Sequence, residues 1–515
     1  MLSVADAFSV EERDSTRSIS TNLQVAWKKD YRPGIVFFQV GVSSIGGNDI
    51  IQGGEGVTSD WNKYLYQEET DNIMFAAWER ELNQPMGGVT KALAEVRLDN
   101  TTGRYTPRYA GGDSELFTAV ALPRRPFNLQ AGFNYDGIDH NIAQFIGVTT
   151  DAPRIDKRSR TIELKGADFI DYLQNRYVDN ESMFTGLRSD QVIEQLLINS
   201  GFSTSQYDLD YGINLIPFGE FQVGQRFGDI IQKIVQAENA IFWQDEEGRL
   251  RFQNRQAWDN YPYFNVQRII TTPQVIEART PDRSHLINVV EVKAKPRTKQ
   301  PAQLMWQLQS PLELPSRQNV EMFVNFDDPM LEIYDPGNLT ANIEQDGSGT
   351  DIASYIQVKS ISKFARACKI VFYNNYTSAG WLTGLTIFGR PARVAKDIYL
   401  RAQDDSSVTA YEQQPLLIEN DYINSQDWAN SYAQMILNDY SEPENLQEIV
   451  IRAIPELQLG DLISWQGRYW RVFGIKSKVD PASGFVQELK LLQRTIKTYF
   501  RIGISVIGGA DMISP

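Results

Sequence analysis

Histidine, the side chain that most often binds zinc or moves protons near neutral pH, is rare in this sequence. The 515 residues contain only two, His140 and His285, and neither belongs to an H-E-x-x-H motif or another paired spacing. No Ser-His-Asp or Cys-His arrangement can be recognised around them. We therefore interpret both as surface or turn residues, and the sequence supports neither a histidine-based zinc site nor a hydrolase triad.

Other reactive motifs are absent or incomplete. Residues 41–45, Gly-Val-Ser-Ser-Ile, resemble a nucleophile elbow, but Ile45 stands where that motif requires glycine. There is no phosphate-binding loop, and no Gly-x-Gly-x-x-Gly turn opens a helix after a strand. A glycosidase needs only two carboxylates, yet nothing singles out a pair among 65 acidic residues. We assign no catalytic residue and no cofactor.

The region 310–412 contains two groups of residues that could bind a ligand. Its aromatic residues around Trp381 could stack on sugar rings, although a β-sandwich core explains them at least as well. Its aspartates could offer oxygen ligands to calcium, but their spacing does not match the twelve-residue calcium loop. We interpret them as exposed turn residues and assign no metal ligand. These aspartates are Asp327, Asp328, Asp335, Asp346 and Asp351.

Composition excludes several classes of protein. The net charge of −15 argues against a general nucleic-acid binder, because phosphate neutralisation needs a surplus of lysine and arginine. An acidic surface suits solubility, and it would repel DNA rather than hold it. The 42% hydrophobic and 11% aromatic residues can form real cores, and the aromatic content favours β structure.

Cysteine usage and the N-terminus indicate folding in a reducing cytoplasm. The single cysteine, Cys368, rules out an intrachain disulfide framework, and we interpret it as a small buried side chain. The first six residues have neither a basic flank nor an apolar core, so we expect no signal peptide. No apolar run approaches the roughly 18 residues that span a bilayer, so we expect no stable membrane insertion.

The periodicity of the chain changes along its length. From residue 34 to 166, short alternating strands are separated by Gly, Pro, Asn and Asp turns, which is typical of a barrel or sandwich. From 167 to 254 the pattern is helical, with Ser189 as the expected N-cap of one helix and a second helix from about Phe227. The second helix is expected to face Ile230, Ile231, Ile234 and Val235 inward, and it leads into a hairpin around the polar turn 245–248. Strand character then returns, and a helix capped by Ser425 precedes the last β-rich stretch, in which Gln466-Gly467 is expected to form a tight turn. The predicted fold class is α+β, predominantly β.

A twelve-residue motif occurs twice, at 40–51 and at 502–513, with seven identical positions at a constant offset of 462. Each copy indicates a strand, a Gly-Gly turn that permits positive φ, and a second short apolar strand. It is either a convergent hairpin or a pair of docking strands offered to similar partner surfaces. On the second interpretation the candidate assembly contacts are Gly41, Ser43, Ile45, Gly46, Gly47, Asp49, Gly503, Ser505, Ile507, Gly508, Gly509 and Asp511.

The order of several soft motifs resembles the minor tail proteins of the phage baseplate-hub family, over roughly 30–300 and 412–495. A β-rich region leads to a helix, then to a hairpin, and finally to a helix followed by a Leu-Gly-Asp turn. The segments that carry the resemblance are 145–148, 161–168, 169–173, 193–197, 242–252, 422–423, 429–433 and 457–461.

The resemblance implies two tube-like β-barrels in each chain, with an α+β module between them and a β-rich insertion that the simplest hubs lack. The implied divisions are an N-terminal arm at 1–29, a first barrel at 30–166, the α+β module at 167–258, a second barrel at 259–300 plus 412–495, the insertion at 301–411 and a C-terminal docking segment at 496–515.

Such a hub is a homotrimer in the virion, assembled in the host cytoplasm, that joins a six-fold tail tube or distal ring to a three-fold central fibre or spike. Its implied partners are other tail proteins, including the tape measure, and DNA that passes without specific binding. Two alternatives stay open: a tail-associated hydrolase of cell wall or capsule, and a host-glycan-binding tail module in which the 310–412 block holds the sugar.

Overall fold

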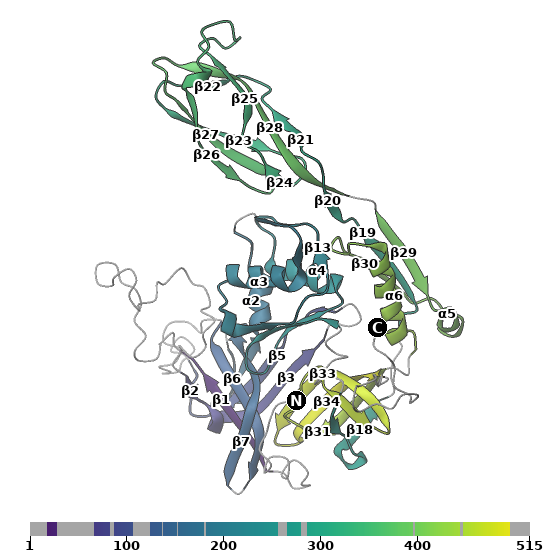
Figure 1. Ribbon diagram of the computed structural model, residues 1–515. Helices are drawn as coiled ribbons and strands as arrows, with labels where there is room; N and C mark the ends of the chain where they lie inside the picture. Colours follow the sequence, from purple (N-terminus) through teal and green to yellow (C-terminus); the bar gives the residue numbers. More distant parts are fainter. Residues whose placement is uncertain are drawn as a thin grey trace, which may run out of the picture.

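The computed structural model of the chain describes residues 18–27, 66–82, 87–106, 124–135, 137–151, 153–179, 182–255, 265–279, 286–394, 397–442 and 446–494. These residues are predominantly β, with 51% in strands and 16% in helices, which agrees with the predicted fold class. Figure 1 shows three parts: a large sheet, a helix-bearing module beside it, and an elongated sandwich that projects away.

One sheet of 14 strands contains strands from both β-rich regions of the sequence. Its central path runs β18-β31-β34-β33-β3-β5-β9-β7-β6-β1-β2, so β33 pairs directly with β3. The strands are β1 (Ile19–Val25), β2 (Gln67–Glu68), β3 (Ile73–Glu81), β5 (Leu93–Asp99), β6 (Pro126–Tyr135), β7 (Ile138–Thr149), β8 (Arg154–Asp156), β9 (Thr161–Ala167), β17 (Val266–Ile269), β18 (Val275–Arg279), β31 (Leu446–Arg452), β32 (Leu462–Trp465), β33 (Arg468–Asp480) and β34 (Gly484–Arg494).

Two hydrophobic cores lie along this one sheet. The first contains Phe127, Phe133 and Phe145 from β6 and β7, and the second contains Trp470 and Leu489 from β33 and β34. They are not separate, because Phe485 of β34 is buried in the first core between Trp78 and Phe133. The two β regions predicted as barrels are therefore joined both by backbone pairing and by packing.

The α+β module lies between these regions along the chain and packs on the end of the first. The apolar residues of α4 recur at three- and four-residue spacing, and Ile230, Ile231, Ile234 and Val235 are all buried, as predicted. Its elements are β4 (Gly88–Val89), α2 (Phe169–Asn175), β10 (Ser182–Phe184), β11 (Leu187–Arg188), α3 (Ser189–Asn199), η4 (Thr204–Gln206), β12 (Tyr207–Leu209), β13 (Leu215–Ile216), β14 (Gly219–Phe221), α4 (Phe227–Ala237), β15 (Ile241–Gln244) and β16 (Leu250–Gln253).

One helix start in this module differs from the prediction. Arg188, not Ser189, is the N-cap of α3. Ser189 lies in the first turn, where its hydroxyl donates to the buried carboxylate of Glu238. The serine is therefore used for a tertiary contact rather than for the local cap that its residue type suggests.

A smaller three-stranded sheet connects the module to the rest of the chain. Strand β19 pairs antiparallel with β29 and parallel with β30, and α6 covers its apolar side. The Ser425 hydroxyl accepts the backbone N–H of Trp428, which confirms the predicted cap of α6. The predicted divisions placed β19 and β29 in different units, yet they are partners about 100 residues apart. The elements are β19 (Val289–Ala294), β29 (Ile398–Gln403), α5 (Asp405–Tyr411), β30 (Pro415–Glu419) and α6 (Gln426–Tyr440).

The remaining strands form a two-sheet sandwich around its own core. The 15-residue strand β28 pairs with five shorter strands, and β27 lies between β23 and β26 in the second sheet. Figure 1 shows the sandwich joined to the body at β20. Its strands are β20 (Arg297–Lys299), β21 (Gln303–Gln307), β22 (Leu312–Leu314), β23 (Asn319–Asn325), β24 (Met330–Ile333), β25 (Gly337–Asn342), β26 (Ile356–Lys363), β27 (Ala367–Asn374) and β28 (Gly380–Val394).

Candidate functional site

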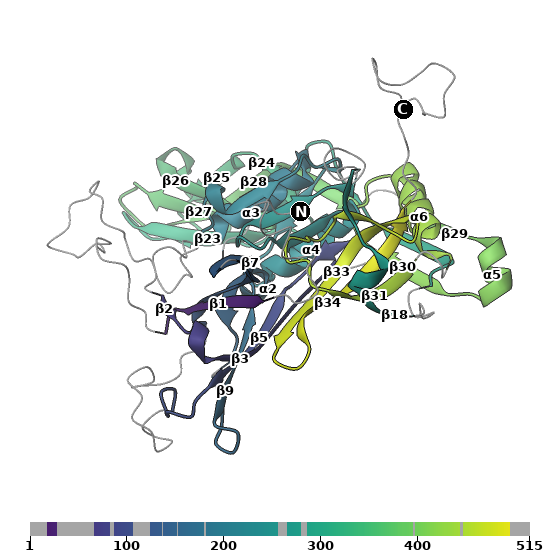
Figure 2. The ribbon, with the colours of Figure 1, turned by 90° about the horizontal axis from the view of Figure 1, so that it is seen from below.

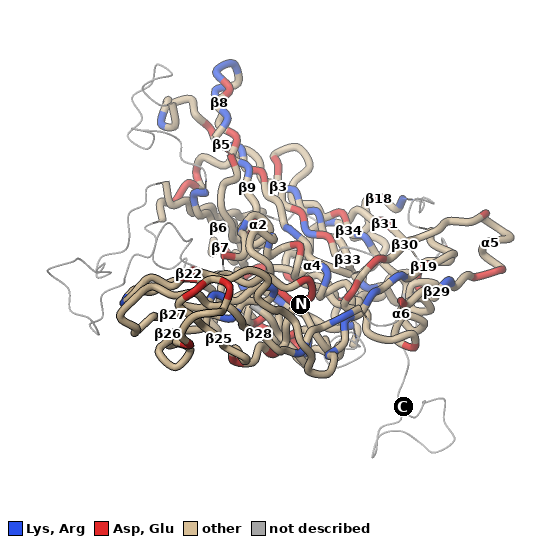
Figure 3. The backbone as a smooth tube through the Cα atoms, turned by 90° about the horizontal axis from the view of Figure 1, so that it is seen from above, with Lys and Arg blue, Asp and Glu red and all other residues tan. Residues whose placement is uncertain are grey.

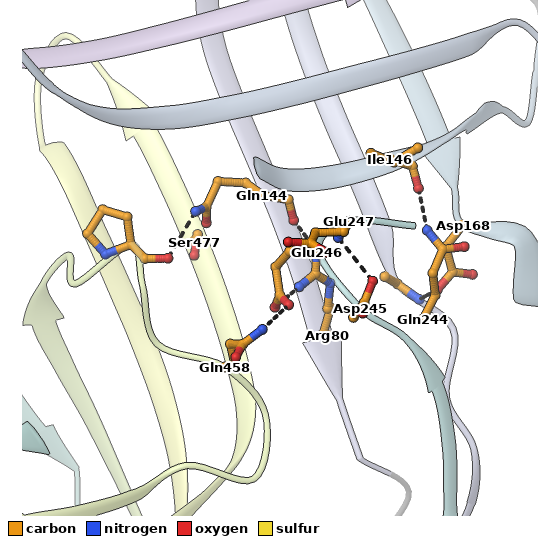
Figure 4. A network of polar contacts seen from close by, with 12 residues as sticks. Arg80, Gln144, Ile146, Asp168, Gln244, Asp245, Glu246, Glu247, Gln458 and Ser477 are labelled. Carbon is orange, nitrogen blue, oxygen red and sulfur yellow. Dashed lines mark hydrogen bonds and ion pairs between the residues drawn. The ribbon is translucent and has the colours of Figure 1, made fainter. Parts of the chain in front are cut away.

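A buried polar junction lies where the large sheet, the α+β module and a loop of the second region meet (Figure 4). Arg80 of β3 has only 8% of its surface exposed, and its guanidinium donates to the side chain of Glu246 and to the backbone carbonyl of Gln144. Glu246 comes from the turn between β15 and β16, and Gln144 from β7. One cation thus holds together the sheet and the module.

The same network extends to the loop 453–461, which follows β31. The Gln144 side-chain amide donates to the carbonyl of Pro455 at 2.9 Å, and Gln458 Nε2 donates to Glu246 Oε2 at 2.7 Å. The buried Glu246 carboxylate is therefore bonded by groups from both β regions. Because both partners of this ion pair are shielded from water, removing either one would leave an uncompensated charge.

Side chains in this junction replace a missing strand at the edge of β7. Strand β9 pairs with β7 only at Val148 and Thr149, which leaves the earlier part of that edge without a neighbouring strand among the described residues. Arg80 donates to the carbonyl of Gln144, and Gln244 Nε2 donates to that of Ile146 at 2.7 Å. A buried carbonyl needs a hydrogen-bond partner, and these side chains supply it.

A second carboxylate, Asp168, positions helix α2 beside the junction. Its Oδ2 accepts the backbone N–H of Ala92 at 2.8 Å and its Oδ1 accepts that of Ile170 at 3.1 Å. Gln244 Oε1 accepts the N–H of Phe169 at 2.8 Å, so the start of the helix is held by two buried side chains. Desolvation by burial raises the pKa of Asp168 to about 7.

Replacing Asp168 by asparagine is expected to change how stability depends on pH. Since the pKa of this acid is higher in the folded chain than in the unfolded one, the folded state binds more protons between about pH 4 and 7. The free energy of unfolding should therefore fall as pH rises through that window, by at most about 4 kcal/mol from this group. Urea unfolding at pH 4.5 and 7.5 should show a smaller difference for Asp168→Asn than for wild type; an equal difference would contradict the assignment.

The large sheet also presents a charged face on the side of β3 opposite Arg80. Glu79 lies directly across from Lys476, which in turn lies across from Glu488, and Glu95 lies across from Lys165. Figure 3 shows the two colours interspersed along these strands. Five acids and five bases make up this charged face: Glu79, Glu81, Glu95, Arg97, Glu163, Lys165, Lys476, Lys478, Glu488 and Lys490.

Ion pairs on the charged face cross from one β region to the other. Lys490 Nζ lies 2.7 Å from Glu81 Oε2, and Lys476 Nζ lies 3.7 Å from Glu79 Oε2. Such exposed pairs add little stability individually. Together they form a surface on which positive and negative side chains neutralise each other over a short distance. This surface lies beside an open depression lined by residues that include Ala77, Glu95 and Lys165.

None of the twelve residues predicted as assembly contacts can be placed, because residues 40–51 and 502–513 lie outside the described part of the chain. The junction residues were missed by reasoning from the sequence alone. One signal was available for Arg80: in the alternating strand β3 it is in phase with Ala76 and Trp78, which face the core.

The cysteine and two of the aspartates named in the sequence analysis have ordinary structural roles. Cys368 is fully buried, as predicted, and burial raises the pKa of its thiol to about 11. Asp346 accepts from Ser348 in a turn, and Asp328 pairs with Arg393 at 2.7 Å. Within the described residues, no three His, Cys, Asp or Glu side chains gather as they would around a metal ion, and no helix is long and apolar enough to cross a membrane.

Comparison with known proteins finds similarity to solved structures only. No family model matches the chain, and no curated protein matches it. The 43 kDa tail protein of prophage MuSo2 from Shewanella oneidensis has a TM-score of 0.42 at 11% identity, over 84% of this chain and 96% of that one. A tail protein from Neisseria meningitidis has a TM-score of 0.46 at 8% identity, over 93% and 97%.

A third similar structure is the prophage tail protein gp18 from Listeria monocytogenes, with a TM-score of 0.40 at 9% identity over 85% of this chain and 94% of that one. All three are tail proteins, the class that the sequence resemblance indicates. At these identities and TM-scores the similarities carry no argument about function, which must be inferred from the chain's own geometry.

Proposed function

We propose that this chain is a structural hub of a phage tail tip. In this role three copies form a ring that joins a six-fold tail tube or distal ring to a three-fold central fibre or spike and lines the channel for DNA. The observation that carries the proposal is the single 14-stranded sheet, which places two β regions with two cores side by side in one chain.

Two β regions in each chain suit a protein that joins a six-fold partner to a three-fold one. A ring of three chains that each offer two adjacent β units presents six units to a six-fold partner, while its own symmetry stays three-fold. The units must not move relative to each other, and the structure provides two devices for this. Backbone pairing of β3 with β33 joins the two β regions into one sheet, and the ion pair of Arg80 with Glu246 fixes the junction beside it.

The charged face suits a channel wall. A surplus of lysine and arginine would bind phosphates and release counterions, which would hold passing DNA. On the charged face the five bases each have acidic neighbours, as in the pairs of Lys476 with Glu79 and Lys490 with Glu81. A hydrated, neutral wall of this kind supports passage without specific binding.

We further propose that the chain acts as a structural protein rather than an enzyme. Buried ionisable groups are the first places to look for a reaction centre. Two of them, Asp168 and Glu246, bond to backbone or to other side chains: Asp168 caps α2, and Glu246 is bonded by Arg80 and Gln458. These contacts support a role in positioning the parts of the fold.

The oligomeric state tests the proposed function. Light scattering of the purified chain should give three times the mass of one chain, and negatively stained particles should show a three-fold ring with a pseudo-six-fold face. A mass of one chain at every concentration and salt condition, or a ring of another symmetry, would contradict the proposal.

A further inference from the structure

A strongly basic hairpin projects from one end of the large sheet. Residues 154–160, which form β8 and the turn that leads into β9, contain four cations and one aspartate on a chain whose net charge is −15. The backbone N–H groups of Arg158 and Ser159 donate to Asp156 Oδ1, which fixes the turn. Lys157, Arg158 and Arg160 are exposed and form no ion pair with any described acid.

A strongly acidic arm lies elsewhere on the same molecule. From residue 402 to 451 the sequence has ten acids and no lysine, arginine or histidine. This stretch includes α5, β30 and α6. Within the described part of the chain, its exposed Asp405, Glu412 and Asp427 have no cation within ion-pair distance. Asp405 and Glu412 are seven residues apart at the two ends of α5, a spacing of about two helical turns.

The two charged features cannot neutralise each other within one copy. Figure 3 shows the blue hairpin at β8 projecting from one side of the molecule, while α5 lies at the tip of another. Figure 2 shows the same separation between β9 and α5. Screening in about 0.1 M salt limits the attraction of exposed charges to roughly 10 Å, so the separated features need a second molecule to meet an opposite charge.

We propose that the basic hairpin of one copy docks on the acidic α5 arm of the next copy. This contact is head-to-tail, the kind of interface that generates a closed ring when the rotation between neighbours closes. It rests on the proposed function, and it names the surfaces that join neighbouring chains. Nucleic acid is the less suitable occupant, because a tip with three unpaired cations neutralises few phosphates and the remaining surface repels them.

A charge swap tests the docking. Association of wild type is compared by mass photometry in 0.1 M NaCl with a hairpin variant, Lys157→Glu with Arg158→Glu, and an arm variant, Asp405→Lys with Glu412→Lys. Each variant places like charges in the contact, so each should weaken association by about tenfold or more. Combining all four substitutions restores opposite charges and should bring the association constant back to within a few-fold of wild type.

The control has the same change in net charge at exposed positions of the sandwich, Arg317→Glu with Lys359→Glu, and should associate like wild type. The proposal is overturned if the hairpin variant behaves like this control or if the four-substitution variant is not rescued. Loss of binding to a DNA duplex by the hairpin variant, without any effect on association, would assign the hairpin to nucleic acid and also overturn it. If wild type forms the ring and the charge-reversal variants form it equally well, the docking alone is refuted. If wild type never associates, the ring is refuted as well.

Discussion

Replacing Arg80 by methionine should lower the free energy of unfolding by about 3–5 kcal/mol, because it leaves the Glu246 carboxylate buried without its cation. The carbonyl of Gln144 would lose a hydrogen bond at the same time. Urea unfolding followed by tryptophan fluorescence measures the change. Since the junction joins the sheet to the α+β module, the module of this variant should separate from the sheet before the rest of the chain unfolds. This separation should appear as a second transition at a lower urea concentration.

Two variants make this expectation specific. Arg97→Met removes an arginine from the charged face of the same sheet and should change stability by no more than about 0.5 kcal/mol. Combining Arg80→Met with Glu246→Gln removes both charges and should recover part of the loss. An Arg80 variant as stable as the Arg97 variant would show that the junction does not hold the parts together.

Replacing Phe485 by alanine should be equally severe, at about 3–5 kcal/mol. Phe485 is 4% exposed, and the centroid of its ring lies 5.7 Å from that of Trp78 and 6.2 Å from that of Phe133. Because β34 otherwise belongs to the second core, the cavity would also remove an aromatic contact between the two β regions. Thermal unfolding should then show the two regions melting separately.

Phe485→Leu is the matched control, since it keeps most of the apolar volume and should cost less than half as much as alanine. A loss below about 1 kcal/mol for Phe485→Ala, with one unchanged cooperative transition, would mean that strand pairing alone joins the regions.

Local patterns were sufficient for most individual elements. The spacing of Ile230, Ile231, Ile234 and Val235 predicted α4, and the polar turn at 245–248 predicted the hairpin of β15 and β16. The Gln466-Gly467 turn between β32 and β33 was predicted for the same reason, and both residues adopt positive φ. Each of these signals depends on residues that are close together in the sequence.

Contacts between distant segments were not predictable in this way. Arg80 and Glu246 are 166 residues apart, and Gln144 and Pro455 are 311 apart. The segment around Glu246 looks like an exposed acidic turn, and nothing local indicates that an arginine from another strand buries it. The pairing of β3 with β33 is equally non-local, so the division into two barrels followed from a family resemblance rather than from the residues themselves.

The orientation of the charged face within the proposed ring is the most direct test of the proposed function. An image reconstruction of the purified ring, at a resolution that separates β-strands, would show which way β3 and β33 face. We expect three copies whose charged face, marked by Glu79 and Lys476, lines the central channel. A ring in which that face points outward or is covered by a neighbouring copy would contradict it.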